Sequence, residues 1–136
     1  MTQLPSKTKN EYWVHSAHPA SPNDWTEHSG KWLIFVPLKQ LDEKWTLIAN
    51  ATAAGLLGIE AKAATAKSNG LAQNKWIKVI CVYTYDSTDK MDVMRVRDQL
   101  RILGFTKKLS YKTDQATIAN QYRTSENSKP VSLYYE

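Results

Sequence analysis

Three lysines occur inside segments whose other residues predict β-strands. Lys31 follows Gly30 at the start of the apolar run "GKWLIFVP", Lys62 lies within "IEAKAAT", and Lys112 lies within "SYKTD". Successive side chains of a strand point to opposite faces, so alanines packed on the core would direct Lys62 to the other face, and the same alternation can place Lys31 and Tyr83 there. Ammonium groups converging on one face would bind a dianion such as phosphate, whereas separate lysines would only extend to solvent.

Aromatic residues near these lysines are candidates to hold a planar group. In proteins that bind single-stranded nucleic acids, stacking on an aromatic side chain contributes about 1 to 3 kcal/mol per base. The candidates here are Trp13, Trp25, Tyr83, Tyr85 and Tyr111. For the two tryptophans the alternative is structural, in which they pin the N-terminal segment against the sheet. The net charge of +5 favours an anionic partner.

Two familiar kinds of site do not fit the sequence. A nucleotide-binding P-loop needs a glycine five positions before the Gly-Lys pair and a Ser or Thr after it, but Trp25 and Trp32 occupy those positions. The histidines, His15, His18 and His28, lack the cysteine partners and the spacing of a zinc site. We therefore expect neither a metal nor a cofactor.

The hydrophobic pattern predicts two amphipathic helices, within residues 38–58 and 87–105. Their apolar stripes are Leu41, Trp45, Ile48 and Thr52 in the first and Val93, Val96, Leu100 and Leu103 in the second. Ser87 or Thr88 is the expected N-cap of the second helix, with Asp89 in its first turn. Glycines following the stripes are expected to end both helices.

The remaining apolar runs predict strands at residues 31–38, 59–65, 76–86, 108–114 and 131–136, with a further helical turn or two at 115–123. This order places two helices on one face of a mostly antiparallel sheet. We predict an irregular N-terminal segment at residues 1–29 and a single α+β domain at residues 30–136. The other face of the sheet is left to water or to a ligand.

Cysteine usage and hydropathy predict a cytoplasmic protein without a membrane segment. The single cysteine, Cys81, excludes an internal disulfide and lies in an apolar run, as a reduced and buried thiol would. The N-terminus lacks the apolar region of a signal peptide, and no apolar run approaches the roughly 18 residues of a membrane span.

The ordered blocks of the sequence resemble a known family. Between about residues 30 and 122, the chain is similar to the basophilic-leukaemia-expressed protein family, also described as phosphothreonine-lyase-domain proteins, in the blocks "GKWLIFVP", "LGIEAKAAT", "KVICVYTYD", "DVMRVRDQLRILGF" and "LSYKTDQATIANQY". The resemblance implies a fold similar to that of the cap-binding translation initiation factor, in which a curved sheet is backed by helices and its concave side is free.

A more distant resemblance links the chain to bacterial effector phosphothreonine lyases, which remove phosphate by β-elimination. Carried over block by block, Lys31 matches the phosphate-binding lysine, and Lys62 matches the lysine that abstracts the α-proton. Leu33 stands at the position of the general-acid histidine, and no histidine follows His28. Since a general acid contributes about 10²- to 10⁴-fold to a rate, the resemblance implies binding in preference to catalysis.

Three hypotheses follow. The preferred one is binding of a phosphorylated ligand, namely a nucleotide, an RNA end or a phosphopeptide, on the open face without catalysis. Its candidate phosphate-binding residues are Lys31, Lys62, Lys112 and Arg123, and its candidate stacking residues are Trp13, Trp25, Tyr83 and Tyr111. The second is a lyase with Lys62 as base and one of the three histidines as acid. The third is a protein-interaction module whose exposed aromatic residues contact another chain.

Overall fold

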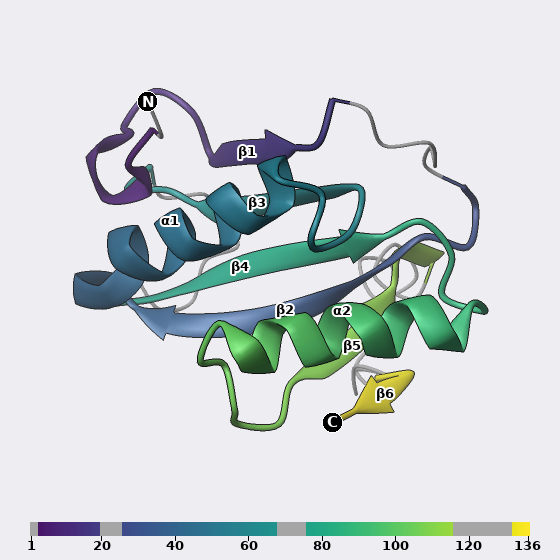
Figure 1. Ribbon diagram of the computed structural model, residues 1–136. Coiled ribbons are helices and arrows are strands. Elements are labelled where there is room, and N and C mark those ends of the chain that lie inside the picture. The colour runs from purple at the N-terminus through teal and green to yellow at the C-terminus, as the bar shows by residue number, and fades with distance from the viewer. Residues whose placement is uncertain (1–2, 20–25, 68–75, 116–131) are drawn as a thin grey trace, which may run out of the picture.

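The side chains on one face of a sheet pack against the apolar stripes of two helices. The computed structural model describes residues 3–19, 26–67, 76–115 and 132–136. In chain order the elements are η1 (Pro5–Lys7), β1 (Trp13–Ala17), β2 (Gly30–Pro37), α1 (Leu38–Ala53), β3 (Glu60–Ala64), β4 (Ile77–Thr84), α2 (Lys90–Ile102), β5 (Ser110–Thr113) and β6 (Tyr134–Tyr135). The strands form one sheet in the order β1-β3-β4-β2-β5-β6, and each neighbouring pair is antiparallel. Figure 1 shows α1 and α2 on the same face of this sheet, as the sequence predicted.

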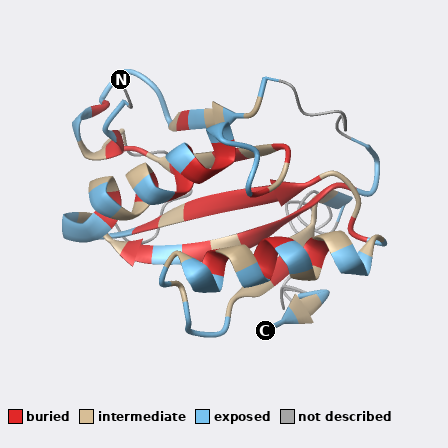
Figure 2. Cartoon of the chain, viewed as in Figure 1, coloured by how far each residue is buried: buried red, intermediate tan, exposed pale blue. Residues whose placement is uncertain are grey.

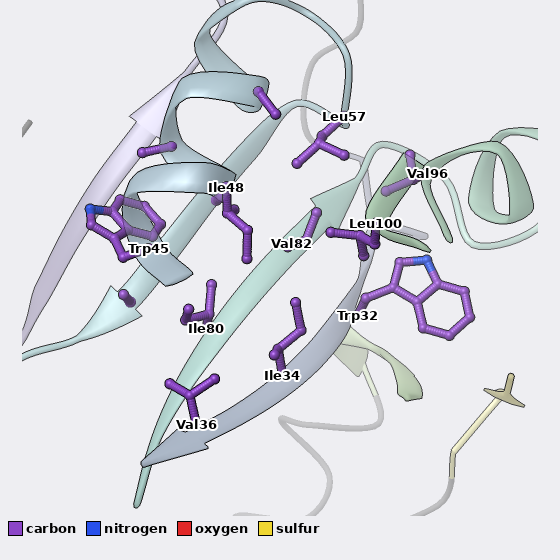
Figure 3. Packing of buried hydrophobic residues seen from close by; sticks show 14 of the residues in the cluster. Trp32, Ile34, Val36, Trp45, Ile48, Leu57, Ile80, Val82, Val96 and Leu100 are labelled. Carbon is purple, nitrogen blue, oxygen red and sulfur yellow. The ribbon is translucent and has the colours of Figure 1, made fainter. Parts of the chain in front are cut away.

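The main hydrophobic core lies between the sheet and the two helices. Figure 3 shows side chains from β2 and β4 gathered against those of the helices; among its buried members are Trp32, Ile34, Val36, Leu41, Trp45, Ile48, Ile80, Val82, Val93, Val96 and Leu100. Burying each large apolar side chain contributes about 1.5 to 3 kcal/mol. The Trp32 Nε1 also donates a hydrogen bond of 3.1 Å to the carbonyl of Val93, which fixes α2 on the sheet. Both predicted helical stripes are confirmed, with Leu103 packed at the margin of the core.

The first strand corrects the prediction of an irregular segment before residue 30. Residues 13–17 form β1, which pairs antiparallel with β3 from Trp13 opposite Ala64 to Ala17 opposite Glu60. Val14 is buried in the main core, and the Ser16 hydroxyl donates to the carbonyl of Ala49 in α1. The mixed composition of this stretch hides a strand that is held by its neighbours more than by its own propensity.

The start of α2 also differs from the prediction. The N-cap is Asp89 and not Ser87 or Thr88, because the Asp89 carboxylate accepts a hydrogen bond of 3.1 Å from the backbone N–H of Asp92. A hydrogen bond from the Tyr85 hydroxyl, together with the one from Asp92, lowers the pKa of Asp89. The carboxylate therefore stays charged where the positive end of the helix favours it.

Gly104 and Gly30 are glycines for different structural reasons. Gly104 follows α2 with a φ of +106°, a left-handed conformation that ends the helix at little cost only for glycine. At Gly30 the constraint is space, since a Cβ there would lie 2.3 Å from the Tyr111 hydroxyl oxygen. That hydroxyl lies 2.7 Å from the Thr84 Oγ1 on the helix side of the sheet. The glycine beside Lys31 therefore serves core packing and not a phosphate-binding loop.

A buried arginine joins α2 to the last two strands. Arg97 is fully buried, and its guanidinium donates hydrogen bonds of 2.8 to 2.9 Å to the carbonyls of Phe105, Lys107 and Glu136. Burial lowers its pKa, but arginine keeps its proton at any physiological pH. The three carbonyls belong to the connection that leads into β5 and to the residue after β6, so Arg97 helps to position the strand that carries Lys112.

Burial is uneven across the sheet. Figure 2 shows buried residues along most of β4 and on the sides of the helices that face the strands. A second, smaller group of buried residues, Ile59, Cys81 and Tyr83, packs with Trp13, Leu33, Val79 and Tyr85 away from the main core. Within the described residues, neither helix has the length and apolar character needed to cross a membrane.

Candidate functional site

Strand register determines which side chains share the sheet face that α1 and α2 leave uncovered, here called the open face. In one row across the sheet lie Lys112, Lys31, Tyr83 and Glu60. In the adjacent row lie Leu33, Cys81, Lys62 and His15. The alternation of strand side chains thus brings the three predicted strand lysines and Tyr83 to the same face. Trp13, two residues before His15 on β1, belongs to this face as well.

Lys31 is buried at the centre of the first row. The residue is only 8% exposed, and its Nζ donates a hydrogen bond of 2.9 Å to the Asp114 Oδ1. The Nζ also lies 5.5 Å from the centroid of the Tyr83 ring. A lysine this buried needs a nearby negative charge, and Asp114 supplies it.

Asp114 is a site residue that the sequence reasoning missed. It directly follows β5, and its backbone N–H donates 2.9 Å to the carbonyl of Ser29, which fixes the carboxylate beside the start of β2. The signal was present in "KTD", because Asp114 is two positions after Lys112 and the alternation of a strand would bring both side chains to the same face. The carboxylate contacts the Lys31 ammonium group, which an incoming anion would also contact.

Lys62 lies over aromatic rings. Its Nζ is 4.0 Å from the centroid of the Trp13 ring and 5.7 Å from that of Tyr83. Such cation–π contacts stabilise a charged ammonium by about 0.5 to 2 kcal/mol. Neither Lys62 nor Lys112 forms an ion pair or a hydrogen bond with any of the residues that the structure describes. These two lysines therefore carry the uncompensated positive charge of the open face.

Lys112 stands directly opposite Lys31 on the neighbouring strand. Burial lowers the pKa of Lys112, and the positive charge of Lys31 lowers it further. Like charges directly opposite each other destabilise a pair of strands. An anion bound between them would relieve that repulsion, which makes the pair a candidate binding feature.

Cys81 and Tyr83 form a neutral floor between the lysines. Burial raises the pKa of the Cys81 thiol to about 11, although the charges of Lys62 and Lys31 act in the opposite direction. A thiol with this pKa is protonated at neutral pH, so Cys81 is a poor nucleophile. Burial also raises the pKa of Tyr83, whose phenol stays protonated and able to donate a hydrogen bond.

The three histidines lie apart, each with a different partner. His15 lies on the open face directly opposite Lys62, and its Nδ1 is 3.3 Å from the Glu60 Oε1. The Nδ1 of His18 is 2.8 Å from the carbonyl oxygen of Ala53, and the Nε2 of His28 is 3.4 Å from the Glu27 carboxylate. Within the described ranges, no three His, Cys, Asp or Glu side chains gather where they could hold a metal ion.

Tyr111 does not lie where the sequence reasoning placed it. It is fully buried in the main core, with its ring edge against Trp32 at a centroid distance of 5.1 Å. The prediction that Tyr111 stacks a ligand on the open face is wrong, because alternation along β5 sends it to the face opposite Lys112. The predicted site residues Trp25 and Arg123, and most of the helical turn expected at 115–123, lie outside the described residues.

Comparisons with known proteins agree with the predicted family and with the predicted fold. The sequence model of the family described as "Basophilic leukemia-expressed protein Bles03" matches residues 20–119 of this chain. A crystal structure of schistosome eIF4E complexed with m7GpppA and 4E-BP superposes with a TM-score of 0.59 at 12% identity, covering 81% of this chain and 60% of that one. A second crystal structure of schistosome eIF4E, complexed with m7GpppG and 4E-BP, superposes with a TM-score of 0.56 at 12% identity, covering 81% of this chain and 59% of that one. This chain thus spans about 60% of the length of the solved proteins, and at such low identity the likeness shows the fold alone, which confirms the predicted similarity to the cap-binding factor.

Proposed function

The chain belongs to the family of basophilic leukemia-expressed protein Bles03, and we propose that it binds a phosphorylated ligand on the open face of its sheet without transforming it. One observation carries this proposal: Lys31 and Lys112 are directly opposite each other, and Lys62 lies in the adjacent row on the same face, which α1 and α2 leave uncovered. Like charges directly opposite each other, as Lys31 and Lys112 are, destabilise the pairing of their strands. A bound phosphate would convert that cost into charge-assisted hydrogen bonds.

Each lysine has a distinct part in the proposed complex. Lys62 and Lys112 have no ion pair or hydrogen bond among the described residues, so both can turn to a phosphate without losing such a contact. Lys31 is held by Asp114 at 2.9 Å and would be shared between the carboxylate and the ligand. The Lys31 and Lys62 ammonium groups lie 5.5 and 5.7 Å from the centroid of the Tyr83 ring, and the Tyr83 phenol would donate a hydrogen bond to a further oxygen.

A planar group attached to the phosphate would lie beside Trp13. The ring of Trp13 already contacts the Lys62 ammonium at 4.0 Å, so this one side chain links the aromatic and the cationic parts of the face. The schistosome eIF4E structures contain m7GpppA and m7GpppG, which makes a capped dinucleotide a suitable probe here. Of the four stacking candidates, Trp13 supports this part of the proposal, whereas Tyr83 is only 6% exposed.

Calorimetric titration with phosphothreonine, pyrophosphate and m7GpppG tests the proposal. Lys62→Ala combined with Lys112→Ala should weaken binding of each bound probe at least tenfold, because two charge-assisted contacts contribute at least about 1.4 kcal/mol together. The matched control is Lys44→Ala combined with Lys90→Ala, which removes the same charge from the helices. If the two double variants have equal effects, binding reflects net charge only, and no site on the open face exists.

The register also gives specific support to a second candidate, a phosphothreonine lyase. His15 lies opposite Lys62, although Leu33 occupies the position that resembles the acid of the lyases. The neutral amine of Lys62 would take the α-proton, the Cβ–O bond would break as the double bond forms, and the imidazolium of His15 would give its proton to the departing phosphate. Mass spectrometry of phosphopeptides after long incubation distinguishes the candidates. A dehydrated residue would show elimination, and unchanged masses would retire the lyase.

A further inference from the structure

The open face changes from charged to apolar along β2 and β4. Beyond the row of Lys31 and Tyr83, the paired residues are in turn Leu33 and Cys81, Phe35 and Val79, and Pro37 and Ile77. Phe35 is 65% exposed and Ile77 is 40% exposed. Large apolar side chains this exposed on neighbouring strands form a patch that is suited to contact with a ligand or a partner.

A hollow lies at the apolar end of this strip. It has a volume of about 490 Å³ and is lined by Pro37, Leu38, Lys39, Trp76 and Ile77. Ile77 belongs to both the strip and the hollow, so the two are continuous. The hollow is large enough for an apolar side chain, and Lys39 supplies the only charge among its lining residues.

The spacing along the strip matches an extended peptide. At about 3.3 Å per residue, Phe35 lies about 13 Å beyond Lys31, and the start of the hollow at Pro37 lies about 20 Å beyond it. An extended peptide has the same rise per residue. Its side chains four to six positions from a phosphorylated residue at Lys31 would therefore reach Phe35 or the hollow.

The distribution of charge favours one phosphate and not many. Lys31, Lys62 and Lys112 share the charged end with the carboxylates of Glu60 and Asp114. RNA carries one negative charge per nucleotide, and along the strip its next phosphates would meet Leu33, Phe35 and Val79 in place of lysines. A ligand with one phosphate followed by apolar groups fits this arrangement better.

We propose that the ligand is a phosphopeptide, bound in extended form along β2 and β4. Its phosphate contacts Lys31, Lys62 and Lys112, and an apolar side chain four to six residues away rests on Phe35 or enters the hollow beside Trp76. This inference rests on the proposed function and specifies the ligand of the same site. Phe35 then determines specificity without contributing to the binding of phosphate itself.

Fluorescence anisotropy with labelled ten-residue peptides tests the inference. Each peptide contains one phosphothreonine in a Gly-Ser background, with a leucine placed four, five or six residues away on either side, or alanine at the same place. At least one leucine peptide should bind about tenfold more tightly than its alanine counterpart. Phe35→Ala should remove that gain and leave the affinity for free phosphothreonine unchanged. Met91→Ala, which truncates an exposed apolar side chain on α2 at the opposite face, should change neither value.

Two outcomes overturn the inference and leave the proposed function standing. In the first, all leucine peptides bind no better than their alanine counterparts. In the second, a 5′-phosphorylated RNA or phosphatidic acid vesicles bind more tightly than every peptide, and Phe35→Ala does not change their affinity. If free phosphothreonine, pyrophosphate, the RNA and every phosphopeptide fail to bind the unchanged protein, the proposed function itself is wrong.

Discussion

If the open face binds a phosphorylated ligand as proposed, Asp114 is the residue that we expect to affect the affinity most. Its carboxylate holds Lys31 at 2.9 Å and, in the proposed complex, would compete with the ligand for the same ammonium group. Competition of this kind sets an upper limit on affinity, because an incoming phosphate gains only the difference between its own contacts and those of the carboxylate. The residue acts as a built-in counter-ion of the site.

Asp114→Asn is therefore expected to strengthen binding of pyrophosphate several-fold. The amide keeps the shape and can still accept a hydrogen bond from Lys31, but it no longer opposes a second anion. Calorimetry in low-salt buffer measures the change, since salt screens such effects. Asp98→Asn, at a carboxylate paired with Arg101 on the surface of α2, removes the same charge and is expected to leave the affinity nearly unchanged. Weaker binding in Asp114→Asn would show that Lys31 does not contact the ligand.

Lys112 gives the site a pH dependence of defined sign. Its pKa is lowered by burial and by Lys31, so it begins to lose its proton at a pH below 10.5, the ordinary value. A bound phosphate favours the charged form and raises that pKa. We expect affinity for pyrophosphate to fall as the pH rises through the range just below 10.5, with proton uptake on binding there. Titrations in buffers of different ionisation enthalpy measure the uptake, and an unchanged pH profile in Lys112→Gln would contradict this assignment.

The same depressed pKa has a consequence for stability. A lysine whose pKa is lower in the folded state is protonated less readily there than in the unfolded chain, so its charge opposes folding below that folded pKa. The penalty disappears as the pH rises from the folded pKa towards 10.5. Lys112→Gln should therefore raise the urea midpoint at neutral pH, whereas an ordinary surface lysine such as Lys90 should show little change. A lower midpoint in Lys112→Gln would mean that Lys112 stabilises the sheet.

At the scale of elements, α2 positions β5 and hence Lys112. Arg97 carries this connection through its hydrogen bonds to Phe105, Lys107 and Glu136. Arg97→Leu fills similar space but leaves three carbonyls without their donor, and we expect a loss of about 3 kcal/mol in the free energy of unfolding. Urea denaturation measures this loss. Arg101→Leu, at an exposed arginine of the same helix, should cost less than about 1 kcal/mol, and an equal effect of the two variants would contradict the role assigned to Arg97.

The sequence was most informative where periodicity reports burial. The apolar stripes of both helices could be predicted. The alternation that points Lys62 and its neighbouring alanines to different faces of the sheet could be predicted too, since both patterns follow from one face being apolar. The strand β1 could not, because His15 and Ser16 give no strong propensity and pairing with β3 supplies the stability. Tyr111 was misplaced because the phase of the four-residue strand β5 is not evident without its neighbours.

At the scale of the whole molecule, α1 and α2 cover one face of a six-stranded antiparallel sheet, and the three strand lysines lie on the other face. The same layering in schistosome eIF4E at 12% identity shows that many sequences can build it. The pairing of Lys31 with Asp114, 83 positions apart in the chain, was beyond sequence reasoning because it depends on the return of β5 beside β2.

The most direct test is an NMR titration of the isotope-labelled protein with phosphothreonine, following backbone amides and lysine side-chain signals. The account predicts saturable shifts centred on Lys31, Lys62 and Lys112 and on Tyr83 between them, with only small changes in α1 and α2. Shifts centred on the exposed side of the helices, or no saturable shift at millimolar ligand (about 4 kcal/mol of binding free energy), would contradict binding of a phosphorylated ligand on the open face.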